Sequence, residues 1–97
     1  MSEHCVANGQ GRYALSGVFT KETIPALERD IAPKFSQEAP VTLDLSGIDD
    51  CDSALVALLI EWKRDYPEIQ LEAATDRLMR LLHMYQVESY FFDENLK

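Results

Sequence analysis

The chain has 97 residues, 46% of them hydrophobic, and a formal net charge of −8. This length and apolar content suffice for one domain with one core that needs neither disulfides nor a metal, so we expect a single domain over residues 1–97. Acidic residues outnumber basic ones by 17 to 9. That balance argues against binding nucleic acid and against docking directly on an anionic membrane, because both favour basic surfaces.

A β-hairpin is the first predicted element. An Asn-Gly pair at positions 8–9 lies between two strand-like runs, residues 4–7 and 12–16, and this pair is a strong hairpin signal. In the second run Tyr13 and Leu15 alternate with residues of lower hydrophobicity, which is typical of a half-buried strand.

The next element is a helix, marked by apolar residues at helical spacing: Ile24, Leu27, Ile31 and Phe35. Thr20 or Thr23 can cap its start, and Pro25 is tolerated in a first turn. Pro33 should kink the helix or end it early, because proline lacks the backbone N–H that a helix interior requires.

A strand is predicted over residues 41–45, with Val41, Leu43 and Leu45 on one side.

A second helix should begin near Ser53 and end near Asp65. Its predicted inward face is formed by four residues: Leu55, Leu58, Leu59 and Trp62. Its first half is apolar nearly all round, through Val56, Ala57 and Ile60 as well. Such a helix is buried on every side or covered by a partner.

The remaining pattern predicts a strand over residues 69–73 and a third helix capped by Thr75. The inward stripe of that helix is Leu78, Leu81, Leu82 and Tyr85.

Helices alternate with strands after the hairpin, which indicates an α/β fold: a mixed sheet of about four strands with about three helices packed on it. Strands that are joined through helices should lie parallel.

Three carboxylates, Asp49, Asp50 and Asp52, surround Ser53 at the start of the second helix. An EF-hand loop counted from Asp50 would need glycine at its sixth position, where Leu55 stands, so a metal site is not supported. No Gly-rich phosphate loop is found, and no histidine motif would activate Ser53 as a nucleophile. We therefore expect no catalytic residues, no metal and no cofactor, and we expect Asp52 or Ser53 to cap the helix.

The two cysteines, Cys5 and Cys51, are expected to be free thiols of a cytoplasmic protein, because no signal-like segment is seen at the N-terminus. We interpret Cys51 as a small residue that fills space in a loop rather than a redox group. The longest apolar run, residues 54–60, is far shorter than the ~20 residues of a transmembrane helix.

Residues 43–59, which read LDLSGIDDCDSALVALL, resemble the signature of STAS domains. In that family a strand ending in Asp-Leu-Ser leads through a short loop to Asp-Ser or Asp-Thr at the start of an apolar helix. The resemblance extends to the opening hairpin and the last helix, and it is strongest to the MlaB-type domains of phospholipid-transporting ABC transporters.

The resemblance implies a binding module without enzymatic activity. It implies as partner the ATPase subunit of such a transporter (MlaF-like), which would hold the protein at the cytoplasmic side of the inner membrane. The implied contact surface is the start of the second helix: Asp50, Asp52, Ser53, Ala54, Leu55 and Val56. Leu55 and Val56 would add an apolar patch beside the Ser53 hydroxyl.

An alternative implied by the same family is an anti-sigma-factor antagonist, controlled by phosphorylation of Ser53. The family usually places glycine one or two positions after this hydroxyl residue, where Ala54 and Leu55 stand here. That departure favours a packing contact over a phosphorylation switch.

Overall fold

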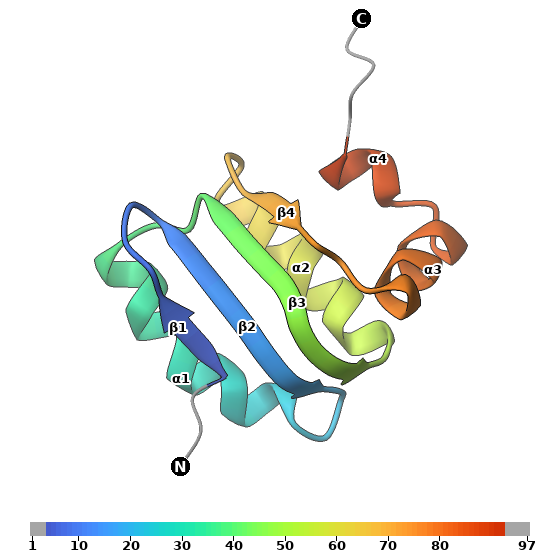
Figure 1. The fold of residues 1–97 in the computed structure, drawn as a ribbon, viewed down its shortest axis with the longest axis horizontal. Helices are drawn as coiled ribbons and strands as arrows, with labels where there is room; N and C mark the ends of the chain where they lie inside the picture. Colours follow the sequence, from blue (N-terminus) through green and yellow to red (C-terminus); the bar gives the residue numbers. More distant parts are fainter. Residues whose placement is uncertain (1–3, 93–97) are drawn as a thin grey trace, which may run out of the picture.

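The computed structural model describes residues 4–92, and the expected α/β fold is confirmed: a compact domain with a four-stranded mixed sheet. The elements in chain order are β1 (Cys5–Ala7), β2 (Arg12–Phe19), α1 (Ile24–Gln37), β3 (Thr42–Cys51), α2 (Ser53–Asp65), β4 (Gln70–Glu72), α3 (Asp76–Met84) and α4 (Glu88–Phe91). Helices α1 and α2 cover one face of the sheet, and α3 and α4 lie beyond its β4 edge (Figure 1).

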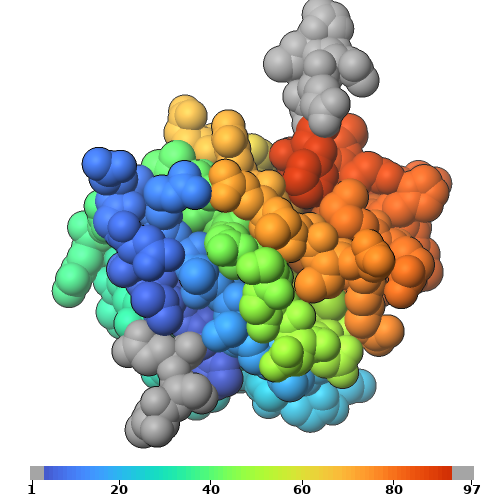
Figure 2. Space-filling model, viewed as in Figure 1, coloured from blue at the N-terminus to red at the C-terminus, as the bar shows by residue number. Residues whose placement is uncertain are grey.

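The strands follow one another in the order β1-β2-β3-β4. β1 pairs antiparallel with β2 through the predicted hairpin, whereas β2 with β3 and β3 with β4 are parallel. The sheet face away from α1 and α2 is open, and strand side chains form the surface there (Figure 2). An ion pair between Arg12 and Glu72, 3.2 Å apart, connects β2 to β4.

β3 is twice as long as the predicted strand, because the segment after Leu45 continues to pair with β2 up to Cys51. Two register shifts in this pairing break the alternation of buried and exposed residues. Val41 was expected on the same side as Leu43 and Leu45, and this was wrong. Val41 precedes the strand and is 43% exposed, whereas both leucines are fully buried.

Helix α1 continues to Gln37, so Pro33 does not end it. The turn after Pro33 is held from outside the helix: the Tyr13 hydroxyl lies 2.9 Å from the carbonyl oxygen of Lys34 and 2.6 Å from that of Glu38. The ring of Phe35 packs edge-on against Tyr13, with centroids 4.9 Å apart. Contacts from another part of the chain thus support the turn after Pro33, which cannot donate a helical hydrogen bond.

The start of α1 has the predicted N-cap residue but lacks the predicted capping hydrogen bond. Thr23 occupies the N-cap position, but its side chain makes no capping bond to the helix. Its hydroxyl donates to the Val18 carbonyl, 2.8 Å away, and accepts from the backbone N–H of Thr20 at 2.9 Å. Thr23 therefore ties α1 to the end of β2.

The core lies between the sheet and the helices. Its fully buried members with less than 2% exposure include Leu15, Phe19, Ile31, Leu43, Leu45, Leu55, Leu59, Leu78 and Leu82. The predicted stripe of α3 is right for Leu78 and Leu82 but wrong for Tyr85, which is 50% exposed. The sequence did not predict α4, whose Phe91 is buried against the core.

Leu59→Ala tests the packing of α2. Leu59 is 1% exposed, so its truncation should leave a cavity and lower the free energy of unfolding by about 2–5 kcal/mol. Urea denaturation followed by circular dichroism measures this change. An unchanged transition midpoint would mean that this face of α2 is not packed on the sheet.

Tyr13→Phe tests how the end of α1 is held. Removal of the hydroxyl leaves the Lys34 and Glu38 carbonyls without this donor, and we expect a loss of about 1–2 kcal/mol in unfolding free energy. Tyr66→Phe is the matched control, because Tyr66 contributes its ring to the same cluster, with its centroid 5.9 Å from that of Phe35. Equal losses in the two variants would contradict a specific role for the Tyr13 hydroxyl.

Candidate functional site

The junction between β3 and α2 is built around Asp52. One carboxylate oxygen accepts from the Ala54 N–H at 2.9 Å and so caps α2, as expected. The other oxygen accepts from the Lys21 N–H at 3.1 Å, in the connection between β2 and α1. Asp52 therefore positions the first turn of α2 against the end of the neighbouring strand.

Ser53 is the first residue of α2 and its side chain is exposed. No hydrogen bond of its hydroxyl is found within residues 4–92. The first backbone N–H groups of a helix lack intrahelical acceptors, so this end carries a partial positive charge. Ser53 thus presents its hydroxyl at the start of α2, where the Asp52 carboxylate already offsets the partial positive charge of the helix end.

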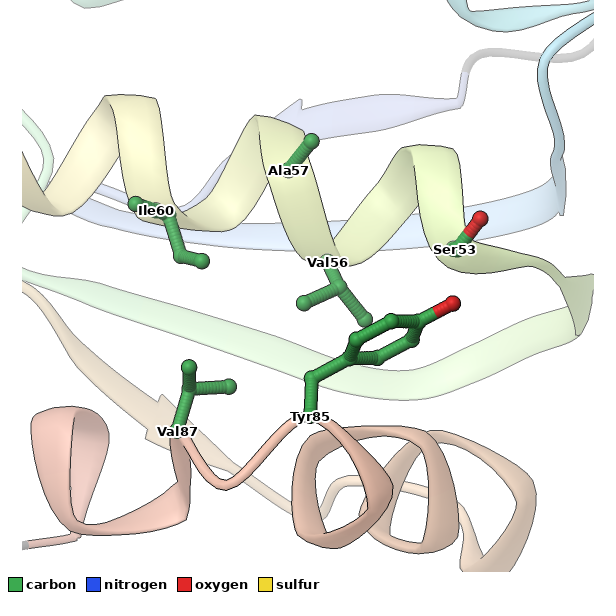
Figure 3. A pocket seen from close by; sticks show the side chains of 6 residues that line it. All are labelled: Ser53, Val56, Ala57, Ile60, Tyr85 and Val87. Carbon is green, nitrogen blue, oxygen red and sulfur yellow. The ribbon is translucent and has the colours of Figure 1, made fainter.

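Beside Ser53 the surface is hollowed by a groove with a volume of about 370 Å³, which we call the Ser53 groove. Its lining residues are Ser53, Val56, Ala57, Ile60, Tyr85 and Val87. The first four come from α2, and Tyr85 and Val87 come from the connection between α3 and α4. Val56 and Ile60 point toward these two residues, whereas Ala57 points away from them (Figure 3). Apart from Ser53 and the Tyr85 hydroxyl, the lining side chains are apolar.

The prediction of an apolar patch from Leu55 and Val56 needs correction. Leu55 is fully buried and Val56 is 4% exposed, because their positions on α2 face the core. Val56 still lines the groove, but the exposed apolar surface comes from Ala57 and from Tyr85 on the opposite wall. Ala54 is half-buried on the side of α2 that faces α1.

The wall of the groove opposite α2 depends on how α3 ends. Gln86 adopts a left-handed conformation with φ 60°. The Val87 N–H donates to the Leu82 carbonyl at 3.0 Å and the Gln86 N–H donates to the His83 carbonyl at 2.9 Å, which is a Schellman motif. The chain therefore reverses at Gln86 and places Val87 in the groove. The usual sequence signal for this reversal is glycine, so the sequence pattern did not reveal it.

The three carboxylates before Ser53 diverge instead of forming one site. Asp50 lies 3.2 Å from the Arg77 guanidinium, which also donates to the Cys51 carbonyl at 2.9 Å. Asp52 caps α2, and Asp49 lines a separate hollow. Within residues 4–92 no group of three metal-ligating side chains is close enough to hold an ion.

Cys51 is the last residue of β3 and is buried, so it lies in a strand and not in the predicted loop. Burial raises the pKa of the Cys51 thiol above its ordinary value; Arg77 opposes the shift, and Asp50 and Asp52 add to it. A thiol with a raised pKa is a poor nucleophile at neutral pH. Cys51 thus fills space beneath the start of α2.

Comparison with known families gives one match over most of the chain. Residues 7–92 match the family model described as "Mlab, STAS domain". A search of the curated proteins finds no match. In residues 4–92 there is also no helix with the length and apolar content needed to cross a membrane.

Asp52→Ala tests the junction. It removes the acceptors of both the Ala54 and Lys21 N–H groups, and we expect a loss of about 1–2 kcal/mol in unfolding free energy. Asp52→Asn keeps one acceptor oxygen and should lose less. Asp50→Ala is a control, because its carboxylate is exposed and pairs with an exposed Arg77. An Asp52→Ala loss no larger than that of Asp50→Ala would contradict the role given to Asp52.

Proposed function

Because the chain belongs to the Mlab-type STAS domain family, we propose that it is a non-catalytic accessory subunit of a phospholipid-transporting ABC transporter. In this role it binds the ATPase subunit (MlaF-like), which it regulates or stabilises, and the complex maintains the lipid asymmetry of the outer membrane. The protein is then cytoplasmic and peripheral to the inner membrane through its complex.

The observation that carries this proposal is the Ser53 groove. An apolar hollow with an exposed hydroxyl at one end and a half-exposed tyrosine as its wall has the composition of a protein interface, which combines an apolar centre with a polar rim. Tyr85 offers a large contact area at a low cost in conformational entropy. Its 50% exposure leaves that area available to a partner.

The environment of the histidines supports a binding role over catalysis by Ser53. His4 interacts through Nδ1 with the Ser16 carbonyl at 2.9 Å, and His83 pairs with Glu88. Neither contact involves Ser53, so the hydroxyl lacks the adjacent base that a nucleophilic serine requires. We therefore assign Ser53 to recognition.

The alternative of a phosphorylation switch at Ser53 is favoured by one observation. The hydroxyl is exposed at the first turn of a 13-residue helix, where the helix dipole favours a negatively charged phosphate. Against it, the adjacent Asp52 carboxylate would repel a second negative charge. The two functions differ in what negative charge at position 53 does, and this difference is measurable.

Ser53→Arg tests the proposed interface. A long charged side chain at the mouth of the groove should weaken binding to the ATPase subunit by more than tenfold, or about 1.4 kcal/mol. Ser53→Ala, which removes one small hydroxyl, should bind nearly as wild type. Glu68→Arg introduces the same side chain at an exposed position beyond the far end of α2 and serves as the control. Full binding by a folded Ser53→Arg protein would remove this surface from the interface.

Comparing Ser53→Glu with Ser53→Gln separates the two functions, because the two side chains have similar size and differ in charge. For a packing contact, both should weaken binding of the ATPase subunit to a similar, moderate extent. For a phosphorylation switch, Ser53→Glu should release the partner while Ser53→Gln retains it. Binding is measured by calorimetry, with folding checked by circular dichroism.

A further inference from the structure

A second hollow lies on the other side of α2, between α2 and α1. Its volume is about 190 Å³ and we call it the Glu28 groove. Its lining residues are Ile24, Glu28, Ala54, Ala57, Leu58 and Glu61. Ala57 also lines the Ser53 groove, so one small side chain separates the two hollows on the outer surface of α2.

The Glu28 groove combines an apolar floor with two carboxylates. Ile24 and Leu58 are 7% and 3% exposed and form the base together with the two alanines. Glu28 from α1 and Glu61 from α2 line the two walls, and each is an acidic residue. Glu28 is half-buried and Glu61 is exposed.

Neither carboxylate is neutralised within the described part of the chain. The ion pairs of residues 4–92 join Arg12 to Glu72, Arg77 to Asp50 and His83 to Glu88. A cation placed between the two walls would pair with both carboxylates through charge-assisted hydrogen bonds.

We propose that the Glu28 groove receives one arginine side chain of the ATPase subunit, an inference that rests on the proposed function. The aliphatic stem of the arginine packs on Ile24, Ala57 and Leu58, and the guanidinium lies between the carboxylates of Glu28 and Glu61. This arrangement matches how arginine buries its methylene groups while its charged end stays at the rim.

Arginine fits this groove better than the other cationic side chain. Its planar fork of five donors can bridge two carboxylates on opposite walls, whereas the lysine ammonium is a compact point charge that is more strongly hydrated. Arginine is also enriched at interfaces where lysine is depleted. An anionic ligand is repelled by the two carboxylates, and a purely apolar group leaves both of them unpaired.

The test begins with Glu28→Gln and Glu61→Gln, which keep side-chain size and remove charge. Each should weaken binding to the ATPase subunit roughly five- to tenfold and make the affinity less sensitive to salt. Glu68→Gln makes the same change in net charge at an exposed site outside both grooves and should change neither quantity. Equal effects of all three variants would indicate a general effect of net charge and overturn the inference.

A double-mutant cycle then identifies the occupant. Each arginine and each lysine of the ATPase is changed to alanine in turn, and its binding is measured against the wild-type chain and against Glu28→Gln. The inference requires one arginine whose loss weakens binding to the wild-type chain but has little further effect on Glu28→Gln. If no arginine is coupled to Glu28 or Glu61, or if a lysine is coupled instead, the arginine site is wrong while the proposed function stands. If the wild-type chain does not bind the ATPase, both are wrong.

Discussion

The two hydrogen bonds accepted by the Asp52 carboxylate are the constraint on which the site depends. One fixes the first turn of α2 and the other fixes the connection that follows β2. Because α1 begins a few residues after that connection, the same side chain positions α1 relative to α2 as well. The Ser53 groove and the Glu28 groove lie on either side of α2, so this junction positions the wall that α2 contributes to each.

Local patterns were sufficient to predict the elements whose signals are local. The Asn-Gly turn, the apolar periodicity of α2 and the capping residues Asp52 and Thr75 all lie where the sequence predicts them. Features that depend on distant parts of the chain were missed. Pro33 remains inside α1 because the Tyr13 hydroxyl, from a different element, supports the turn after it.

The same distinction explains what the sequence did and did not reveal of the candidate site. The position of Ser53 at the start of α2 follows from residues next to it. The groove beside it depends on Tyr85 and Val87, which reach α2 because Gln86 reverses the chain after α3. Helical periodicity assigned Tyr85 to the inward stripe, but α3 ends at Met84 and Tyr85 is its C-cap residue. Helical spacing therefore predicts burial correctly only up to the end of α3, and Tyr85 lies one residue beyond it.

The small size of Ala57 has a consequence for how substitutions on α2 combine. Its methyl group is the common wall of two hollows, so a larger side chain at this position would occupy space in both. We therefore expect a substitution of Ala57 to be non-additive with changes at residues that line either groove, even when these lie on opposite sides of the helix. Ala57 is thus the residue of this surface where a change in side-chain size alters both grooves at once.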